Sequence, residues 1–206
     1  MSAKPLAWIS LGALAELEAP MTKPRILMVA LFLITTAAPG QTSRRREAPP
    51  PADAVSVDSI VAALYGSVSH APEGSPDFDR MRAIFLYVGM FVPPVRPGQE
   101  ITGSDVDGFV SRFEKSAAAR KEKGEAAQGF FEREIARKAD CFGNICQVFS
   151  TYESRHTPSD AKPFERGVNS IQLVHDDKRW WIASVAWDAE KPDKPIPPQY
   201  LPSAKP

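Results

Sequence analysis

The stretch FFEREIARKADCFGNICQVFSTYESR (residues 130–155) decides the fold, because it reads as two β-strands joined by a tight turn. Apolar and polar residues alternate on either side of Gly143-Asn144, and a two-residue turn that starts with glycine is typical of a β-hairpin. The turn sets the cross-strand pairs, which are Cys141 with Cys146, Ala139 with Val148, Arg137 with Ser150, and Ile135 with Tyr152. These pairs are predicted to lie on the buried face of a sheet. The opposite, exposed face is predicted to carry Glu132, Glu134, Lys138, Asp140, Gln147 and Glu153.

A second hairpin is predicted in GVNSIQLVHDDKRWWIASVAWD (residues 167–188). With Asp176-Asp177 as its turn, the pairs are Leu173 with Trp180, Ile171 with Ile182, and Asn169 with Ser184. These residues would share the concave face, and the outer face would carry Val168, Gln172, Trp181, Val185 and Trp187. The tryptophans are predicted to stabilise the sheet by packing. An apolar outer face predicts a homodimer that covers it.

Three amphipathic segments precede the strands and predict three helices. The first covers residues 56–68. The second starts at Ser75-Pro76-Asp77, which has the composition of a helix N-terminus, and becomes a strand near residues 90–92. The third follows Ser104 and Asp107, which resemble a capping box. Helices followed by antiparallel strands predict an α+β fold.

The two ends of the chain read as segments outside the folded domain. Residues 1–40 contain a basic flank, the apolar run Ile26–Ile34 and small residues, which predict a signal peptide cleaved near Gly40-Gln41; an uncleaved anchor is the alternative. Met21 starts a cleaner signal peptide than Met1 and is a candidate for the true start. The remaining parts are a disordered linker at 41–53, a folded domain at 54–190 and a proline-rich tail at 191–206. The protein is therefore expected in the bacterial periplasm or secreted, without a stable membrane span in its mature form.

Composition narrows the partners and the chemistry. The 206 residues include 25 basic and 25 acidic side chains, and this zero net charge disfavours a nucleic-acid partner. Cys141 and Cys146 are the only cysteines, and their opposite positions favour a disulfide over two buried thiols or a redox-active pair. No metal site and no cofactor is predicted, because neither a ligand cluster nor a phosphate-binding motif occurs. His70, His156 and His175 are predicted to be exposed or structural.

Six short segments carry a resemblance to a known family. They are residues 77–82 (DFDRMR), 130–134 (FFERE), 142–145 (FGNI), 149–154 (FSTYES), 167–173 (GVNSIQL) and 179–182 (RWWI). Together they resemble the nuclear transport factor 2-like superfamily, and within it the polyketide-cyclase-like (SnoaL-like) group. The resemblance covers roughly residues 54–190. It implies a cone-shaped, curved antiparallel sheet packed on three N-terminal helices, with a pocket between them, commonly in dimers. The superfamily holds both enzymes and binding domains, so function has to be inferred from the site.

The polar residues of the predicted concave face are the candidate ligand-binding residues. They are Arg137, Ser150, Tyr152, Asn169 and Ser184, with Trp180 beside them. A buried guanidinium needs an acceptor, so Arg137 either pairs internally with Asp79 or Glu153 or binds an anionic group of a ligand. We therefore predict an exported, non-catalytic or weakly catalytic protein that binds a small, partly apolar molecule, with an anionic group suited to Arg137.

Two alternatives remain open. Enzymes of the superfamily generally place an Asp or His acid/base inside the cone, whereas the predicted concave face offers neither. An isomerase, dehydratase or hydrolase would have to use Asp79 or Tyr152 as its proton carrier. The other alternative is a dimeric interaction module whose pocket is filled by its own side chains. An internally paired Arg137 without a cavity would favour the module, and an unpaired Asp79 in an apolar cavity would favour the enzyme.

Overall fold

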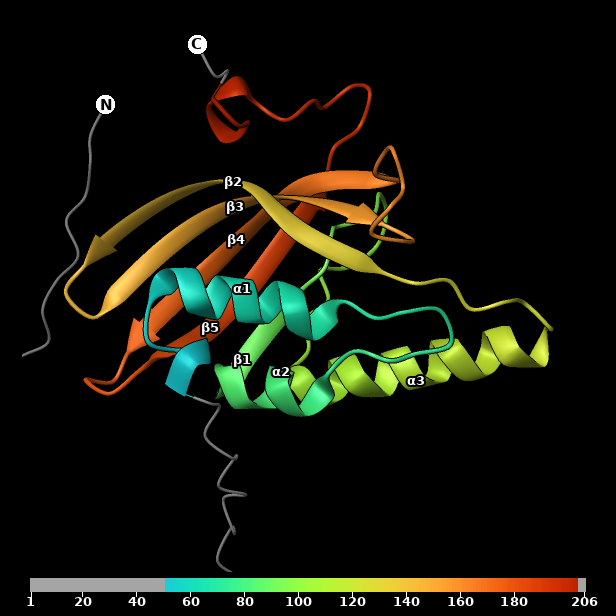
Figure 1. Cartoon of the computed structure of the whole chain (residues 1–206), viewed down its shortest axis with the longest axis horizontal. Helices are drawn as coiled ribbons and strands as arrows, with labels where there is room; N and C mark the ends of the chain where they lie inside the picture. Colours follow the sequence, from blue (N-terminus) through green and yellow to red (C-terminus); the bar gives the residue numbers. More distant parts are fainter. Residues whose placement is uncertain (1–50, 204–206) are drawn as a thin grey trace, which may run out of the picture. The chain divides into compact units, whose positions relative to one another are not determined.

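The computed structural model describes residues 51–203, in which one five-stranded sheet packs on three helices (Figure 1). The helices are α1 (Val57–Val68), α2 (Phe78–Ile84) and α3 (Val106–Glu122). The strands are β1 (Phe85–Val92), β2 (Phe131–Phe142), β3 (Ile145–Arg155), β4 (Glu165–His175) and β5 (Trp180–Ala189). Two short 3-10 helices are η1 (Pro51–Asp53) and η2 (Pro198–Tyr200). The predicted signal peptide, its cleavage site and the candidate start at Met21 lie outside the described residues.

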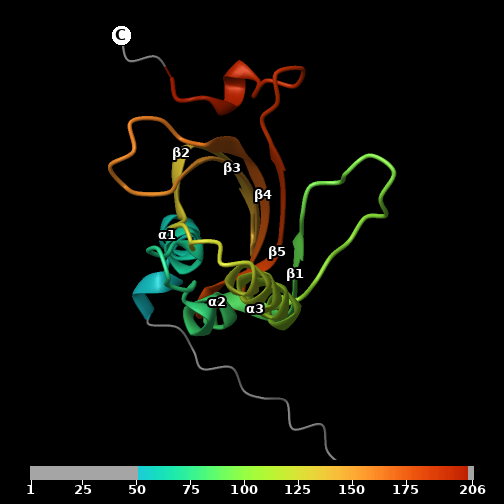
Figure 2. The same cartoon turned by 90° about the vertical axis from the view of Figure 1, so that its right-hand side faces the viewer.

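The sheet has the strand order β1-β5-β4-β3-β2, and its concave side faces the three helices (Figure 2). Strands β2 to β5 pair antiparallel, so the predicted α+β architecture of a curved sheet on helices is confirmed. The strand predicted near residues 90–92 starts earlier, at Phe85, and this strand, β1, pairs parallel with β5 at the edge of the sheet. Residues 85–92 (FLYVGMFV) are rich in aromatic and β-branched side chains, which favour a strand over the longer second helix that the sequence analysis predicted.

The helix starts differ in detail from the predicted ones. A capping box of Ser56 and Ser59 begins α1. Helix α2 is capped by Asp77, whose side chain accepts a hydrogen bond from the Arg80 N–H at 3.0 Å. Helix α3 is capped by Asp105, and not by a box of Ser104 and Asp107, since the backbone of Ser104 is already paired with β1.

The folded domain begins before the predicted boundary at residue 54. Residues 51–53, predicted as the end of a disordered linker, form η1 instead. The Asp53 carboxylate accepts two hydrogen bonds from Arg80, at 2.8 and 2.6 Å, and Ala54 is buried. Within residues 51–203, none of the helices combines the length and the apolar character needed to cross a bilayer.

The first hairpin has the predicted register near its turn and a different one farther away. The pairing runs as predicted from Phe142 opposite Ile145 to Arg137 opposite Ser150. Gly143 has a φ of +54°, as a type II′ turn requires at its first position. The pairing then skips Ile135, which forms a β-bulge, and Glu134 lies opposite Tyr152. The predicted pair of Ile135 with Tyr152 is therefore wrong, and the bulge turns Glu132 and Glu134 to the concave side.

The second hairpin has a longer turn than predicted. The turn contains four residues, Asp176–Arg179, because the Asp176 carboxylate accepts the backbone N–H groups of Lys178 and Arg179 at 3.0 and 2.9 Å. His175 consequently lies opposite Trp180, and the pairing slips once more between Leu173 and Gln172. The observed pairs are Leu173 with Ile182, Ile171 with Val185, and Asn169 with Trp187. The predicted inward position of Ser184 and the predicted outward positions of Val185 and Trp187 are therefore wrong.

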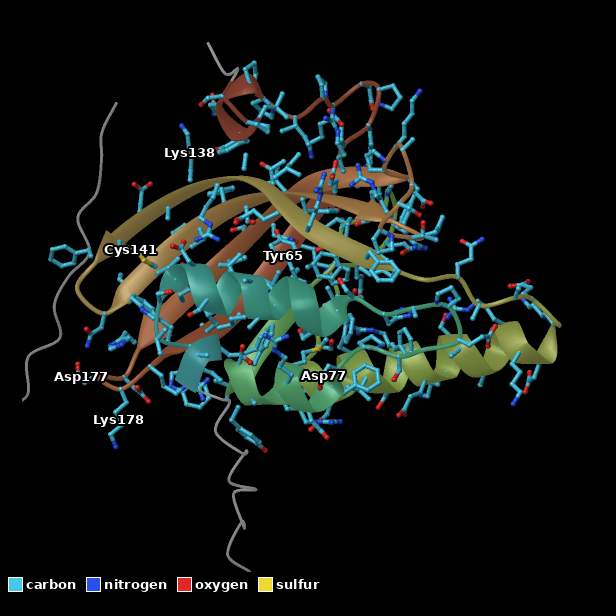
Figure 3. All side chains as sticks on the ribbon, viewed as in Figure 1. Tyr65, Asp77, Lys138, Cys141, Asp177 and Lys178 are labelled. Carbon is cyan, nitrogen blue, oxygen red and sulfur yellow. A yellow bond between two sulfur atoms is a disulfide. The ribbon has the colours of Figure 1, made fainter. Side chains whose placement is uncertain are left out.

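The C-terminal tail packs on the convex side of the sheet. The Tyr200 ring stacks on Phe149 with 5.4 Å between centroids, and the Tyr200 carbonyl accepts a hydrogen bond from the Thr151 hydroxyl at 2.5 Å. Figure 3 shows Lys138 on this side, beside η2, and its ammonium group lies 5.9 Å from the Tyr200 ring. Ile196 is 7% exposed. The tail thus covers part of the face that was predicted to carry a dimer interface.

The predicted disulfide joins Cys141 and Cys146 at the end of the β2–β3 hairpin (Figure 3). The bond closes a loop with a sequence separation of only 5, so we expect reduction to lower the free energy of unfolding by about 2 kcal/mol. Urea unfolding with and without tris(2-carboxyethyl)phosphine measures this loss. A Cys141→Ala/Cys146→Ala variant is the control, since its stability should not respond to the reductant. A loss above about 4 kcal/mol would contradict the expectation.

Candidate functional site

A cavity of about 280 Å³ lies between the helices and the concave side of the sheet. Its apolar lining comes from four elements and the residue preceding β2: Leu64 and Val68 on α1, Phe91 on β1, Phe109 on α3, Phe130, and Val185 and Trp187 on β5. The volume is close to the lower end of the ~300–1,000 Å³ that is usual for small-molecule sites. The cavity therefore has room for a small, mainly apolar molecule.

Four polar side chains complete the lining: Glu132, Tyr152, Glu165 and Asn169. The Tyr152 hydroxyl donates a hydrogen bond to Glu165 at 2.9 Å, and the Ser154 hydroxyl donates one to Glu132 at 3.1 Å. No Lys, Arg or His occurs among the described residues that line the cavity. Its ionisable polar groups are therefore acidic or phenolic.

Glu132 is a buried carboxylic acid of this cavity with a raised pKa. Burial raises the pKa of Glu132 to about 7, and repulsion by the Glu165 carboxylate adds to the increase, whereas hydrogen bonding by Ser154 and Asn169 lowers it. Near neutral pH this carboxyl group exists in both protonation states, which suits a proton carrier and also a site that binds a charged ligand. Burial also raises the pKa of Tyr152, so its hydroxyl stays protonated and serves as a donor.

A hydrogen-bonded network connects the cavity to Arg137. The Asn169 amide donates to the Tyr65 hydroxyl at 3.1 Å, and this hydroxyl lies 2.7 Å from the Ser150 hydroxyl, between α1 and the sheet (Figure 3). Ser150 donates to Glu134 at 2.5 Å. Arg137 donates two hydrogen bonds to the same carboxylate, at 2.8 and 2.6 Å.

Arg137 is thus paired internally, but with other partners than predicted. Its guanidinium contacts Glu134 and Asp58, and not Asp79 or Glu153. Because these carboxylates already satisfy the guanidinium and Arg137 is absent from the cavity lining, the predicted ligand-binding role of Arg137 loses its basis.

The structure brings only part of the predicted site together. Tyr152 and Asn169 line the cavity, and Ser150 belongs to the network behind it. Trp180 packs at the end of the core, with its ring 4.9 Å from the His175 ring, and does not line the cavity. Ser184 faces the convex side because of the slip in the β4–β5 pairing.

The sequence analysis missed two acids of the cavity, Glu132 and Glu165. The candidate Asp79 is 98% exposed and pairs with Arg82 at 3.1 Å, so the condition under which Asp79 would favour an enzyme, an unpaired carboxylate in an apolar cavity, is not met. Glu132 was assigned to the exposed face because strict alternation was continued through Ile135. The only signal in the sequence was the run of charged residues at 132–134, which an exposed strand explains equally well.

Two further cavities border this one. A cavity of about 640 Å³ shares Val68, Phe109 and Phe130 with it and is also lined by His70 and His156. A polar cavity of about 440 Å³ shares Glu132. Among residues 51–203, no three His, Cys, Asp or Glu side chains gather in a way that would hold a metal ion.

Two comparisons by sequence found no match, whereas the comparison with solved structures found proteins of similar fold. No protein-family model matches the chain, and no curated protein matches it. It is 15% identical to an NTF-2 like protein of unknown function from Silicibacter pomeroyi DSS-3, over 66% of this chain and 94% of that one, with a TM-score of 0.44. It is 13% identical to an NTF2-like protein of unknown function from Shewanella baltica OS155, over 64% and 91%, with a TM-score of 0.41.

A third similar structure is an enzyme subunit. The chain is 12% identical to the beta subunit of the benzoate 1,2-dioxygenase from Burkholderia mallei ATCC 23344, over 71% of this chain and 97% of that one, with a TM-score of 0.45. Similarities of this size assign no ligand and no reaction. The described curved sheet on three helices, with a cavity between them, is itself the architecture that the resemblance to the nuclear transport factor 2-like superfamily implied.

Proposed function

We propose that this chain is an exported protein that binds a small, mainly apolar molecule in the cavity beside Glu132. The observation that carries the proposal is the combination of an apolar lining with a few convergent polar groups, Glu132, Tyr152 and Asn169, which is the usual composition of a ligand site. The presence of a cavity also removes the main argument for an interaction module with a filled pocket. Placement in the polyketide-cyclase-like group remains a prediction from the sequence.

This proposal replaces the anionic ligand that the sequence analysis expected. That expectation depended on a free Arg137, whereas Arg137 is held by Glu134 and Asp58. Glu132 and Glu165 line the cavity in its place, and carboxylates repel an anionic group. A ligand that presents hydrogen-bond donors or no charge at all fits this lining better.

The binding test uses N-phenyl-1-naphthylamine, an uncharged fluorophore whose emission rises in apolar surroundings. We expect the wild-type protein to bind it and Val185→Phe to bind it at least ~10-fold more weakly, because the larger side chain fills the cavity. Overpacking typically costs about 1–3 kcal/mol, so Val68→Phe serves as a second variant if Val185→Phe does not fold.

The matched control is Val88→Phe, because Val88 is 73% exposed on β1 and does not line the cavity. Its affinity for the fluorophore should equal that of the wild type. Equal binding by the wild type and by both folded cavity variants would contradict the proposal.

A second candidate function is proton transfer, favoured by the pKa of Glu132 near 7 in an apolar cavity. Glu132 would remove a proton next to a carbonyl group, and the Tyr152 hydroxyl or the Asn169 amide would stabilise the resulting enolate oxygen. Deuterium incorporation into a small cyclic ketone in heavy water tests this reaction. Exchange that Glu132→Gln abolishes would support an enzyme, and exchange equal to that of buffer alone would exclude this substrate class.

We also propose export and dimer formation, and export has the better support of the two. The disulfide favours an oxidising compartment such as the periplasm. The homodimer through the outer sheet face has less support than before, because Val185 and Trp187 face inward and the tail covers part of that face. Its remaining support is the exposure of Phe142 and Ile145 at the end of the β2–β3 hairpin.

A further inference from the structure

We propose that the ligand of this cavity is an organic cation, a substituted ammonium group carried on an apolar body. The inference rests on the proposed binding function and adds the chemical class of the ligand. It comes from three features of the lining taken together: two carboxylates, several aromatic rings, and the absence of a basic side chain among the described lining residues.

The first feature is the pair of carboxylates at one side of the cavity. Glu132 on β2 and Glu165 on β4 both line it, and neither is paired with an arginine or lysine in the described interactions. They are close enough to repel each other, since Glu165 contributes to the raised pKa of Glu132. A cation bound beside them would relieve this repulsion and would favour the ionised form of Glu132.

The second feature is an aromatic wall from three elements. Phe91 lies 4.7 Å from Phe109 and 6.5 Å from Trp187, measured between ring centroids. Phe130 and Tyr152 add two more rings to the lining. Faces of aromatic rings attract substituted ammonium groups, and tryptophan attracts them most strongly. The wall therefore suits the alkyl groups of such a cation as well as its charge.

Other charged ligands fit less well. A metal ion such as Ca²⁺ takes six to eight oxygen ligands, and the described part of the chain offers only two carboxylates here. An anion would lie next to both acids without a basic partner. A compact ammonium ion would leave the apolar lining unused. A cation with an apolar body is the class that satisfies both kinds of lining.

The experiment compares three probes that share a benzyl body and differ in the charge of a tetrahedral head. They are benzyltrimethylammonium, neopentylbenzene, which is uncharged, and phenylmethanesulfonate, which is anionic. The affinity of each probe is measured by its ability to displace N-phenyl-1-naphthylamine from the exported protein at about pH 8. We expect the cation to bind at least ~10-fold more tightly than the neutral probe, and the sulfonate to bind most weakly.

Two variants test whether the carboxylates and the aromatic wall cause the preference for the cation. Glu132→Gln should reduce the preference for the cation over the neutral probe to below ~3-fold, and Trp187→Leu should weaken cation binding by ~3- to 10-fold. The control is Asp140→Asn, which removes an exposed carboxylate from the same strand and should change neither value.

The outcomes separate this inference from the proposed function. Equal or tighter binding of the neutral probe or the sulfonate overturns the cation and leaves small-molecule binding in place. Binding of the fluorophore that none of the three probes displaces has the same meaning. If neither the fluorophore nor any probe binds, both the cation and the proposed function are overturned.

Discussion

Replacing Glu132 with glutamine should raise the free energy of unfolding at pH 8 by up to about 3 kcal/mol. The pKa of Glu132 is about 7 in the folded protein against an ordinary value of 4.5, and one pH unit corresponds to about 1.4 kcal/mol. Because the folded state binds this proton more tightly, the stabilisation is complete below pH 4.5 and is lost as the pH rises through 7. Above that pH the wild type buries a charge, and the glutamine variant does not.

Urea unfolding of both proteins between about pH 5 and pH 8 measures the difference. The two curves should approach each other at acidic pH and separate as the pH rises. Asp140→Asn is the control, since Asp140 is exposed on the same strand and its removal should leave the pH dependence unchanged. A glutamine variant that is no more stable than the wild type at pH 8 would show that Glu132 remains hydrated. A gain in stability on removing an acid is typical of a group kept for function.

Arg137→Met should lower the free energy of unfolding by about 2–4 kcal/mol and leave binding in the cavity intact. The Arg137 and Glu134 side chains are only 19% and 23% exposed, and removing one partner of such a pair leaves a poorly hydrated charge behind. Glu134 would retain Ser150 as its described hydrogen-bond donor. The affinity for N-phenyl-1-naphthylamine should change by less than ~3-fold, because Arg137 does not line the cavity.

Arg133→Met is the matched control on the same strand. The Arg133 side chain is 69% exposed in its pair with Glu153, so its loss should cost less than about 1 kcal/mol. Adding Glu134→Met to Arg137→Met should recover part of the lost stability, because it removes the unpaired charge. A folded Arg137→Met protein that no longer binds the fluorophore would restore the ligand-binding role that the sequence analysis gave to Arg137.

Elements with strong local signals could be predicted from the sequence. The Gly143-Asn144 turn fixed the pairing as far as Arg137 and thereby placed Cys141 opposite Cys146. The apolar residues of α1 recur at helical spacing along its whole length, and the helix matches its predicted range within one residue. In both cases the deciding interactions are between residues close together in the chain.

The errors arose at irregularities of the strands and turns that the alternation of apolar and polar residues does not mark. No local feature of Ile135 marks a β-bulge, which becomes evident only in the pairing of β2 with β3. The second turn was misjudged because an Asp176 side chain that caps two backbone N–H groups stabilises a four-residue loop as well as a tighter turn would. The turn error moved the pairing by two residues and kept the faces, whereas the bulge at Ile135 and the slip between Leu173 and Gln172 exchanged the faces of several residues.

The candidate site suffered most from these exchanges. Tyr152 and Asn169 were found because they lie on β3 and β4, at positions whose face neither irregularity changes. Glu132, Val185 and Trp187 lie beyond a bulge or slip and were placed on the wrong side. The pairing of Arg137 and the acids that line the cavity together changed the expected ligand from an anion to a cation.

The bulge at Ile135 also governs how this chain can be aligned with others of the same fold. In a protein whose equivalent strand lacks the extra residue, the inward-facing positions before the bulge are shifted by one residue relative to those of this chain. A gapless alignment through β2 would match Glu132 with an outward residue and would report an acid as lost or gained when neither is true. Residue-by-residue transfer of roles into this strand from a protein without the bulge therefore requires a gap placed at Ile135.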